Sequence, residues 1–383
     1  MIYELLFPYR NSLGGALGFL NLLRYIPFRV IMATITAMLF SFVLAPWFIR
    51  ELQKKQIGQV VRSDGPESHR VKAGTPTMGG ALILLSLLVP TFLWADMKNP
   101  FVLATAAVTA GYGVIGYLDD YLKIKLRNPA GLAGRYKLIA QIVIGGGALA
   151  FAFLDTTRMP TDWVALRTHL SLPFVAFSKH PILLPMAVYL PFVLVVVIGT
   201  SNAVNLTDGL DGLAIGPVMI SAATYLVWAY IAGSTFQFLQ GGKFVTLPQY
   251  LDIAPNQHAG ELAVYCGAMI GAGFGFLWYN TYPAQVFMGD VGSLALGGGL
   301  GMLAVFTKNE LLSVILGGIF VIEALSVIVQ VTSFKLTGKR IFLMAPIHHH
   351  YEKKGWPEPK IIVRFWIIAV LLALVSLASM KVR

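Results

Sequence analysis

Long apolar runs recur along this chain of 383 residues, and they decide what it can fold into. A helix needs about 20 apolar residues to cross a hydrocarbon core of roughly 30 Å. Hydrophobic residues make up 56% of the chain and charged residues only 12%, which excludes an ordinary soluble domain. We therefore expect an all-α polytopic membrane protein that forms a single integral membrane domain over residues 1–383.

The apolar runs predict about ten transmembrane helices. Residues 1–29 lack the basic start of a signal peptide and are expected to form an interfacial segment. Two runs are short, and the ninth contains Glu323, an ionisable residue to which we assign no role. The glycine groups 145–147 and 297–299 are expected to permit close contact between helices. The predicted spans are 30–49, 79–95, 101–118, 138–154, 182–200, 212–233, 261–279, 291–306, 312–334 and 361–380.

Basic residues are unevenly distributed over the connecting segments. Most of the 29 lysines and arginines fall in alternate loops, which the positive-inside rule assigns to the cytoplasm, with both termini outside. The net charge of +11 is therefore mainly a topology signal, with a secondary role beside anionic lipid and substrate phosphates. We expect a lipid bilayer as partner and no nucleic acid. The external segments 155–181 and 234–260 are expected to be short loops or a hairpin. The predicted cytoplasmic loops are 50–78, 119–137, 201–211, 280–290 and 335–360.

Acidic side chains gather in these cytoplasmic loops. Asp119 and Asp120 end the third span, where the helix dipole disfavours negative charge and two carboxylates repel each other. A divalent cation, or Lys123 nearby, would remove both penalties. Asp290 could supply a third carboxylate to a shared Mg²⁺. Alternatively, Asp119 and Asp120 are simply solvated at the end of the helix, and Asp290 is the N-cap residue of the next helix.

The loop after the fifth span is rich in hydrogen-bonding groups. It contains Asn205, and glycines follow both Asp208 and Asp211. Glycine permits tight turns and a close approach of the backbone to a ligand, so this loop suits recognition of a base and a sugar. Alternatively, Asp211 caps the next helix and Asp208 forms an Asx-turn.

Three further segments could contact a ligand. Lys72 and Thr77, beside a glycine-containing turn, could hold phosphate, although Lys72 also fits the topology signal. Phe287 could stack on a base or anchor the chain at the interface. The triplet His348-His349-His350 could contact a phosphate or sugar, because consecutive histidines rarely converge on one zinc ion.

Five of these segments, in this order, resemble the bacterial phospho-N-acetylmuramoyl-pentapeptide transferase family, within the polyprenyl-phosphate N-acetylhexosamine-1-phosphate transferase superfamily. The Pro-Ile-His-His-His stretch is similar to the muramoyl branch, because relatives that use UDP-N-acetylglucosamine have a different histidine pattern there. The resemblance covers nearly the whole chain. Its matching segments are His69 to Gly80, Leu118 to Lys123, Asn205 to Gly212, Phe287 to Ser293 and Pro346 to Glu352.

This resemblance implies a Mg²⁺-dependent transfer of phospho-MurNAc-pentapeptide from UDP-MurNAc-pentapeptide to undecaprenyl phosphate, giving lipid I and UMP. It implies a multi-pass protein of the bacterial inner membrane, acting at the cytoplasmic face in the first membrane step of peptidoglycan synthesis, and it is compatible with a homodimer. Asp290 and Asp120 would hold the metal, Asp119 would be the base, and His348 would join them in catalysis. The implied substrate-binding residues are Lys72, Thr77, Lys123, Asn205, Asp208, Gly209, Leu210, Asp211, Asn280, Phe287, His348 and His349.

The chemistry of a lipid phosphate agrees with this expectation. Its second pKa is about 6, so it is already mostly dianionic at neutral pH and hardly needs a strong base. We therefore favour a single displacement over an aspartyl-phosphate intermediate. Two alternatives stay open: a sister enzyme that uses another UDP-amino sugar, and a transporter, whose polar groups would lie near mid-bilayer.

Overall fold

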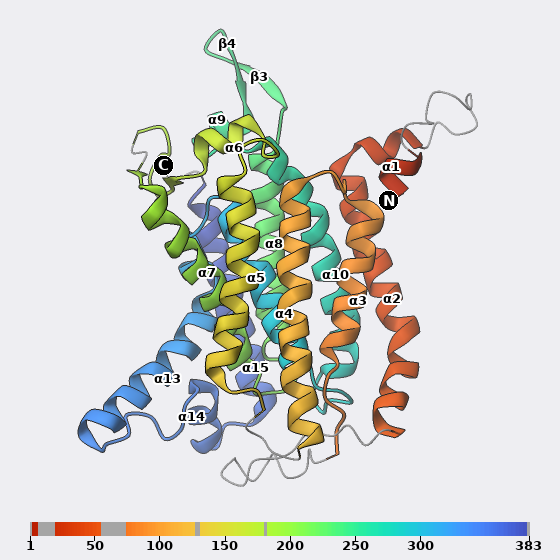
Figure 1. Cartoon of the computed structure of the whole chain (residues 1–383), viewed down its shortest axis with the longest axis vertical. Coiled ribbons are helices and arrows are strands. Elements are labelled where there is room, and N and C mark those ends of the chain that lie inside the picture. The colour runs from red at the N-terminus through yellow and green to blue at the C-terminus, as the bar shows by residue number, and fades with distance from the viewer. Residues whose placement is uncertain (1, 7–19, 55–73, 127–130, 180–181, 381–383) are drawn as a thin grey trace.

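The computed structural model describes residues 2–6, 20–54, 74–126, 131–179 and 182–380, and helices dominate it (Figure 1). Lys72 lies outside the described residues. The first half of the chain forms α1 (Ile2–Leu6), α2 (Ile26–Lys54), α3 (Gly80–Trp94), α4 (Pro100–Lys125), α5 (Gly134–Leu154), α6 (Thr161–Leu166), β1 (His169–Leu170), β2 (Ile182–Leu183) and α7 (Met186–Thr207). The second half forms α8 (Ile215–Ala232), β3 (Gln237–Gln240), β4 (Lys243–Thr246), α9 (Leu247–Tyr250), η4 (Gln257–Glu261), α10 (Leu262–Asn280), α11 (Gly289–Phe306), α12 (Leu312–Leu316), α13 (Gly318–Thr337), α14 (Ile347–Lys353) and α15 (Glu358–Ala378).

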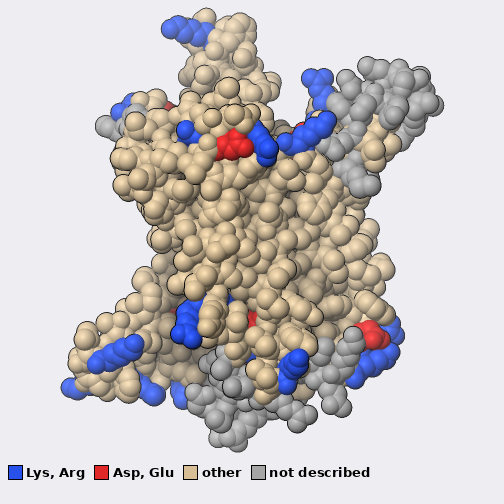
Figure 2. Space-filling view, in the orientation of Figure 1, with Lys and Arg blue, Asp and Glu red and all other residues tan. Residues whose placement is uncertain are grey.

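The polytopic fold that the apolar runs predicted is confirmed. Among the described residues, nine helices are long and apolar enough to cross a membrane, and α3 is a shorter apolar helix of 15 residues. Figure 2 shows charged side chains gathered at the two ends of the molecule, with an uncharged belt between them. Such a belt is the surface that a hydrocarbon core requires, because charged groups are costly there. The chain is a multi-pass membrane protein.

Several helices differ from the predicted spans. α4 continues through Asp119 and Asp120 to Lys125, and α7 continues to Thr207, so residues expected in loops lie in the last turns of helices. Backbone hydrogen bonding continues past the apolar part of a helix, which a hydropathy pattern does not detect. The single helix predicted over 312–334 is wrong, because the chain breaks at Gly317 into α12 and α13.

Helix α11 forms the centre of the bundle. Of its residues, 89% are buried, and it packs against α4, α7 and α3. Helix α13 is the opposite case, with only 22% of its span buried, and it projects sideways from the bundle beside α14 (Figure 1). Outside this centre, α2 packs extensively against α10. Asp290 lies in the first turn of α11, so it is carried by the most buried of these membrane-spanning helices.

Glycine lets α11 approach its neighbours closely. A Cβ added at Gly298 would lie 2.6 Å from the ring of Tyr112 on α4, so this part of the prediction for 297–299 is confirmed. In the group 145–147 the prediction is confirmed at Gly145, where a Cβ would lie 2.5 Å from the hydroxyl of Tyr112. It is wrong at Gly146 and Gly147, where a Cβ would meet nothing within 4 Å. The approach of α11 to α4 is also close at Gly116, where a Cβ would overlap the backbone of Asp290 and Val291. Contact between α4 and α11 thus needs a residue without a side chain at position 116.

The end of the bundle opposite the last turn of α4 carries several short helices and strands. β3 and β4 pair antiparallel as a hairpin, as the sequence predicted for segment 234–260, and β1 pairs with β2. α1 and the end of α15 also lie at this end (Figure 1). Here Glu310 is fully buried and contacts Lys308 Nζ at 3.1 Å and the hydroxyl of Tyr189.

The contact at Gly116 generates a prediction about stability. Gly116→Ala should lower the thermal unfolding temperature of the detergent-solubilised protein by several degrees, because overpacking typically costs about 1–3 kcal/mol. The matched control is Gly146→Ala on α5, where the new methyl group meets open space. Equal unfolding temperatures for the two variants would contradict the close contact between α4 and α11.

Candidate active site

Three carboxylates distant in the sequence meet where α4 contacts α11. Asp119 and Asp120 occupy the last turns of α4 and are buried, and Asp290 occupies the first turn of α11. One oxygen from each of the three groups lies within 4.8 Å of those from the others. The backbone N–H of Val291 donates to Asp120 Oδ2 at 3.3 Å, which ties the two helices together at this point. The convergence expected for these three acids is therefore present.

Two lysines lie against the acid cluster, which is the set Asp119, Asp120 and Asp290. Lys123 Nζ lies 2.5 Å from Asp119 Oδ2, 3.2 Å from Asp290 Oδ2 and 3.6 Å from Asp120 Oδ1. Lys137 Nζ lies 2.8 Å from Asp290 Oδ2 and 3.1 Å from Asp119 Oδ1. Each pair of carboxylates this close repels strongly, and the lysines offset that repulsion. Lys123 was predicted as a site residue.

Lys137 was not predicted as a site residue. In the sequence it is one of several basic residues in a loop that sets topology, and nothing nearby distinguishes it from Arg135. Its position depends on the turn that enters α5. There the backbone N–H of Leu132 donates to Asp119 Oδ1 at 2.8 Å, and Gly131 has a φ of +58°. The turn therefore folds directly over the acid cluster.

The acid cluster has the donor set of a hard divalent cation. Three carboxylates carry three negative charges, and the two lysines offset two of them. Oxygen ligands from one or two carboxylates, completed by water and phosphate oxygens, are what Mg²⁺ takes in proteins. Among the described residues, this is the group of acids, histidines and cysteines that could hold a metal ion. The residues present therefore fit a divalent metal.

Asn205 supports one of these acids. Its Nδ2 donates to Asp290 Oδ1 at 2.9 Å and to Ser293 Oγ at 2.8 Å. Ser293 in turn donates to the carbonyl oxygen of Gly289 at 3.0 Å. Asn205 was expected to bind substrate; here it fixes the orientation of Asp290. Hydrogen bonds of this kind, made to the ligands rather than to the metal, set the direction of a metal-binding carboxylate.

The segment that carries Thr77 pairs with the segment that carries Phe287. Phe287 N–H donates to the carbonyl of Pro76, and its own carbonyl accepts from Gly79 N–H, both at 2.8 Å. At Gly289, whose φ is +70°, a Cβ would lie 2.5 Å from Asp120 Oδ2 and 3.1 Å from Thr77 Oγ1. The hydroxyl of Thr77 and the carboxylate of Asp120 thus converge at the start of α11, as a phosphate-binding role for Thr77 would need.

The loop 208–213 follows α7, the helix whose Asn205 contacts Asp290. Asp208 is half-buried, and burial together with the negative charges of Asp290 and Asp120 raises its pKa to about 8. A bound cation would lower that pKa again. The charges of Asp290 and Asp120 therefore act on Asp208 across the site.

Asp211 and Asn280 are engaged inside the protein. Asp211 Oδ2 accepts from Ala284 N–H at 2.9 Å, and Asp211 N–H donates to Glu358 Oε1 at 2.8 Å. Asn280 Oδ1 accepts from Gly212 N–H at 3.0 Å, while its Nδ2 donates to the carbonyl of Val286 at 2.9 Å. Both residues, which were predicted to bind substrate, connect the loop 208–213 to the segment before α11. Asp211 does not cap α8, whose N-cap residue is Ala214.

The three histidines of α14 point to three different partners. His348 is fully buried, with Nδ1 at 3.1 Å from Glu323 Oε1. His349 Nδ1 lies 2.6 Å from Glu352 Oε2, and His350 Nδ1 accepts from Leu343 N–H at 3.1 Å. Partial burial and the charge of Lys354 lower the pKa of His350. The triplet does not converge on one ion, as expected for consecutive histidines.

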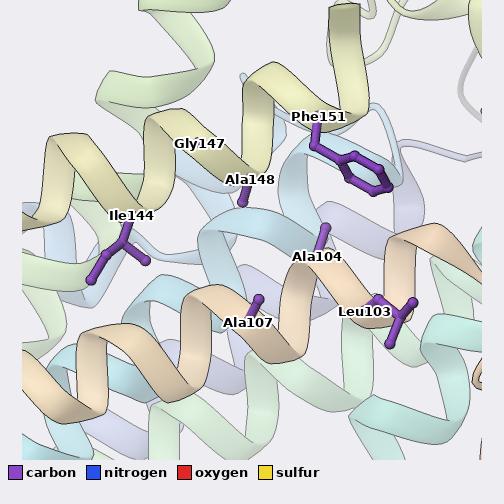
Figure 3. A pocket seen from close by; sticks show the side chains of 7 residues that line it. All are labelled: Leu103, Ala104, Ala107, Ile144, Gly147, Ala148 and Phe151. Carbon is purple, nitrogen blue, oxygen red and sulfur yellow. The ribbon is translucent and has the colours of Figure 1, made fainter. Parts of the chain in front are cut away.

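An apolar pocket of about 380 Å³ lies between α4 and α5, on the part of these helices remote from the acid cluster (Figure 3). Its lining contains no ionisable side chain, so it cannot bind an anionic headgroup. The lining residues are Leu103, Ala104, Ala107, Ile144, Gly147, Ala148 and Phe151.

Comparisons with known proteins identify the family of this chain. The family model described as glycosyl transferase family 4 matches residues 102–308, and a signature described as phospho-N-acetylmuramoyl-pentapeptide-transferase signature 1 matches residues 72–84. A phospho-N-acetylmuramoyl-pentapeptide-transferase of Sorangium cellulosum is 73% identical over 383 residues, with both chains covered completely. Relatives of the same name from Pelobacter propionicus and Citrifermentans bemidjiense are each 54% identical, again over 100% of both chains. With the acid cluster where α4 meets α11, this identity over the full length shows that the chain belongs to the phospho-N-acetylmuramoyl-pentapeptide-transferase family.

Proposed function

We propose that this protein transfers phospho-MurNAc-pentapeptide from UDP-MurNAc-pentapeptide to undecaprenyl phosphate, giving lipid I and UMP. The observation that carries the proposal is the convergence of Asp119, Asp120 and Asp290 with two lysines at one end of a membrane bundle. Full-length relatives named for this activity support it. A reaction between two phosphate-bearing substrates, one of them a lipid, needs such a charged site at the membrane surface.

Mg²⁺ is the cofactor that we propose, held by Asp120 and Asp290. When bound, it supplies positive charge that offsets the repulsion between the two substrates and stabilises UMP as it leaves. Lys123 and Lys137 hold the carboxylates in place, and Asn205 orients Asp290. The site faces the cytoplasm of a bacterial inner membrane in this proposal, because α4, α5 and α13 carry basic residues at the same end of the bundle.

An oxygen of the lipid phosphate attacks the sugar-bearing phosphorus, and the bond from that phosphorus to the oxygen of UMP breaks. Asp119 takes the proton from the fraction of lipid phosphate that is still monoanionic. A single displacement is favoured over an intermediate on Asp119, because the lipid phosphate is already mostly dianionic at neutral pH and is itself the nucleophile. The carboxylate of Asp119 is also held in place by its neighbours. Oδ1 accepts from Leu132 and contacts Lys137, and Oδ2 contacts Lys123.

Some of the other predicted residues form the nucleotide side of the site. Thr77 and Lys72 hold phosphate, Phe287 stacks on the base, and Asp208 and Gly209 line the sugar. Leu210 supports this loop from behind, because its side chain is buried in an apolar cluster with Leu213. A sister enzyme that uses UDP-N-acetylglucosamine is the nearest alternative, and the two UDP-sugars distinguish them in one assay.

The proposed function is tested with purified protein, UDP-MurNAc-pentapeptide, undecaprenyl phosphate and Mg²⁺, with UMP release as the measurement. EDTA should abolish turnover, and added Mg²⁺ should restore it, because the acid cluster cannot bind two phosphates without a cation. Substituting UDP-N-acetylglucosamine should give no release. UMP release from that substrate alone would refute the muramoyl assignment.

Two acid variants should behave differently. Asp290→Asn removes a proposed metal ligand, so turnover should fall by at least about 100-fold and the Mg²⁺ requirement should rise. Asp119→Asn should depress turnover by a similar factor and leave UMP affinity, measured by calorimetry, within about threefold. An adduct of phospho-MurNAc-pentapeptide trapped on Asp119 would overturn the single displacement.

Lys137→Gln tests the contact that the sequence did not reveal. Turnover should fall by about 10–100-fold, because two buried or half-buried carboxylates lose a cationic partner. The half-saturating Mg²⁺ concentration should stay equal or fall, since the acid cluster becomes more negative. The matched control is Arg135→Gln, which removes a nearby exposed cation that stacks on Tyr136 and does not contact the acids. An equal loss of turnover in both variants would show that the total positive charge of this region matters, and not the contact of Lys137 with the acids.

A further inference from the structure

A carboxylate on a lipid-facing helix is buried against a histidine of the loop that follows it. α13 is one of the least buried helices, yet Glu323 has 0% of its side chain exposed, since it lies on the buried face of α13 and contacts His348 of α14. His348 itself is 1% exposed, and its Nδ1 lies 3.1 Å from Glu323 Oε1. The two groups are close enough for an ion pair but are not aligned for a linear hydrogen bond.

Burial of this pair is costly, so its presence in the fold needs a reason. Among the described residues, Glu323 Oε2 and His348 Nε2 have no hydrogen-bond partner, although both atoms are buried. A carboxylate without its imidazole partner would be a buried, uncompensated group, which is strongly destabilising. Two apolar side chains of similar size could fill the same space without that risk. The mechanism at the acid cluster does not use Glu323.

The other edge of the imidazole supports the loop 208–213. A Cβ added at Gly209 would overlap Nε2 of His348 and lie 2.7 Å from its Cε1, so the backbone of the loop rests directly on the ring. Leu210 and Leu213 of this loop pack in one apolar cluster with Ile319 of α13 and Phe365 of α15. Asp208, beside Gly209, is the residue whose charge is coupled to Asp290 and Asp120. A continuous series of contacts therefore runs from Glu323 through His348 to the loop 208–213.

We infer that Glu323 is a positioning residue that acts through His348 to hold the loop 208–213 in the conformation that binds the nucleotide. His348 acts from beneath Gly209 and not by touching the substrate, which its complete burial supports. The inference rests on the proposed function for the identity of the nucleotide. Its consequence is that Glu323 sets the affinity for the uridine nucleotide and not the rate of phosphoryl transfer at the acid cluster.

The test compares Glu323→Gln and Glu323→Leu in the full-length, detergent-solubilised protein. Gln keeps the shape and an acceptor oxygen, and Leu keeps neither. UMP affinity by calorimetry should fall about tenfold for Leu and less for Gln, the order expected when a buried polar group loses its partner. KM for UDP-MurNAc-pentapeptide should rise in parallel. Both kcat and KM for undecaprenyl phosphate should stay within about threefold of their values in the protein without substitutions.

A double variant tests whether Glu323 acts through His348. Glu323→Leu combined with His348→Phe should lose no more UMP affinity than the weaker-binding single variant. The reason is that the effects of substituting two residues in contact are not additive when one acts through the other. Additive losses would show that the two residues act separately and would overturn the inference. A Glu323→Leu variant with lower kcat and unchanged UMP affinity would overturn it as well.

The control variant is Glu310→Gln, which alters a buried carboxylate at the opposite end of the bundle. It should lower the thermal unfolding temperature and leave UMP affinity unchanged, which separates a general loss of stability from a specific effect on the loop. Failure of the two proposals is distinguishable. Absence of UMP release by the unchanged protein refutes the proposed function, whereas the UMP affinities of the Glu323 variants decide the positioning role.

Discussion

The approach of α4 to α11 at Gly116 is the contact on which the site depends. It brings Asp119 and Asp120 to within 4.8 Å of Asp290, and like charges at that distance repel by about 3–4 kcal/mol per pair at an effective dielectric constant of 20. Such a cluster is stable only where cations accompany it. Lys123 and Lys137 provide two positive charges, and the remaining negative charge is what makes the cluster attract a divalent ion.

Two different parts of the fold hold the two halves of the site. The acid cluster is fixed by α4, α5 and α11, the most central helix of the bundle. The loop 208–213 is fixed by the C-terminal part of the chain, through Glu358, Trp366 and the buried pair of Glu323 and His348. Under the proposed function, a rigid reacting centre beside a separately supported recognition loop would allow the affinity for the nucleotide and the rate of transfer to be set by different residues.

Much of this arrangement could be predicted from the sequence. Apolar runs of about 20 residues have one stable solution in a bilayer, so the helical bundle followed directly from them. The acids and the loop glycines were recognised because their chemistry has few uses at a membrane surface. Predictions failed where a structural feature leaves no signal in the local sequence. The break at Gly317 interrupts an apolar run that reads as one helix, and the ends of α4 and α7 extend into polar sequence.

The sequence by itself determined that the chain crosses a membrane repeatedly, and which types of side chain could bind a cation and phosphates. Hydropathy and residue chemistry are local properties, so one chain is enough to establish them. Only the tertiary structure decided which predicted residues meet. It brought Lys137 to the acids, turned Asn205 toward Asp290 and buried His348 beneath Gly209. These outcomes depend on helix packing between segments up to 153 residues apart, which no local pattern encodes.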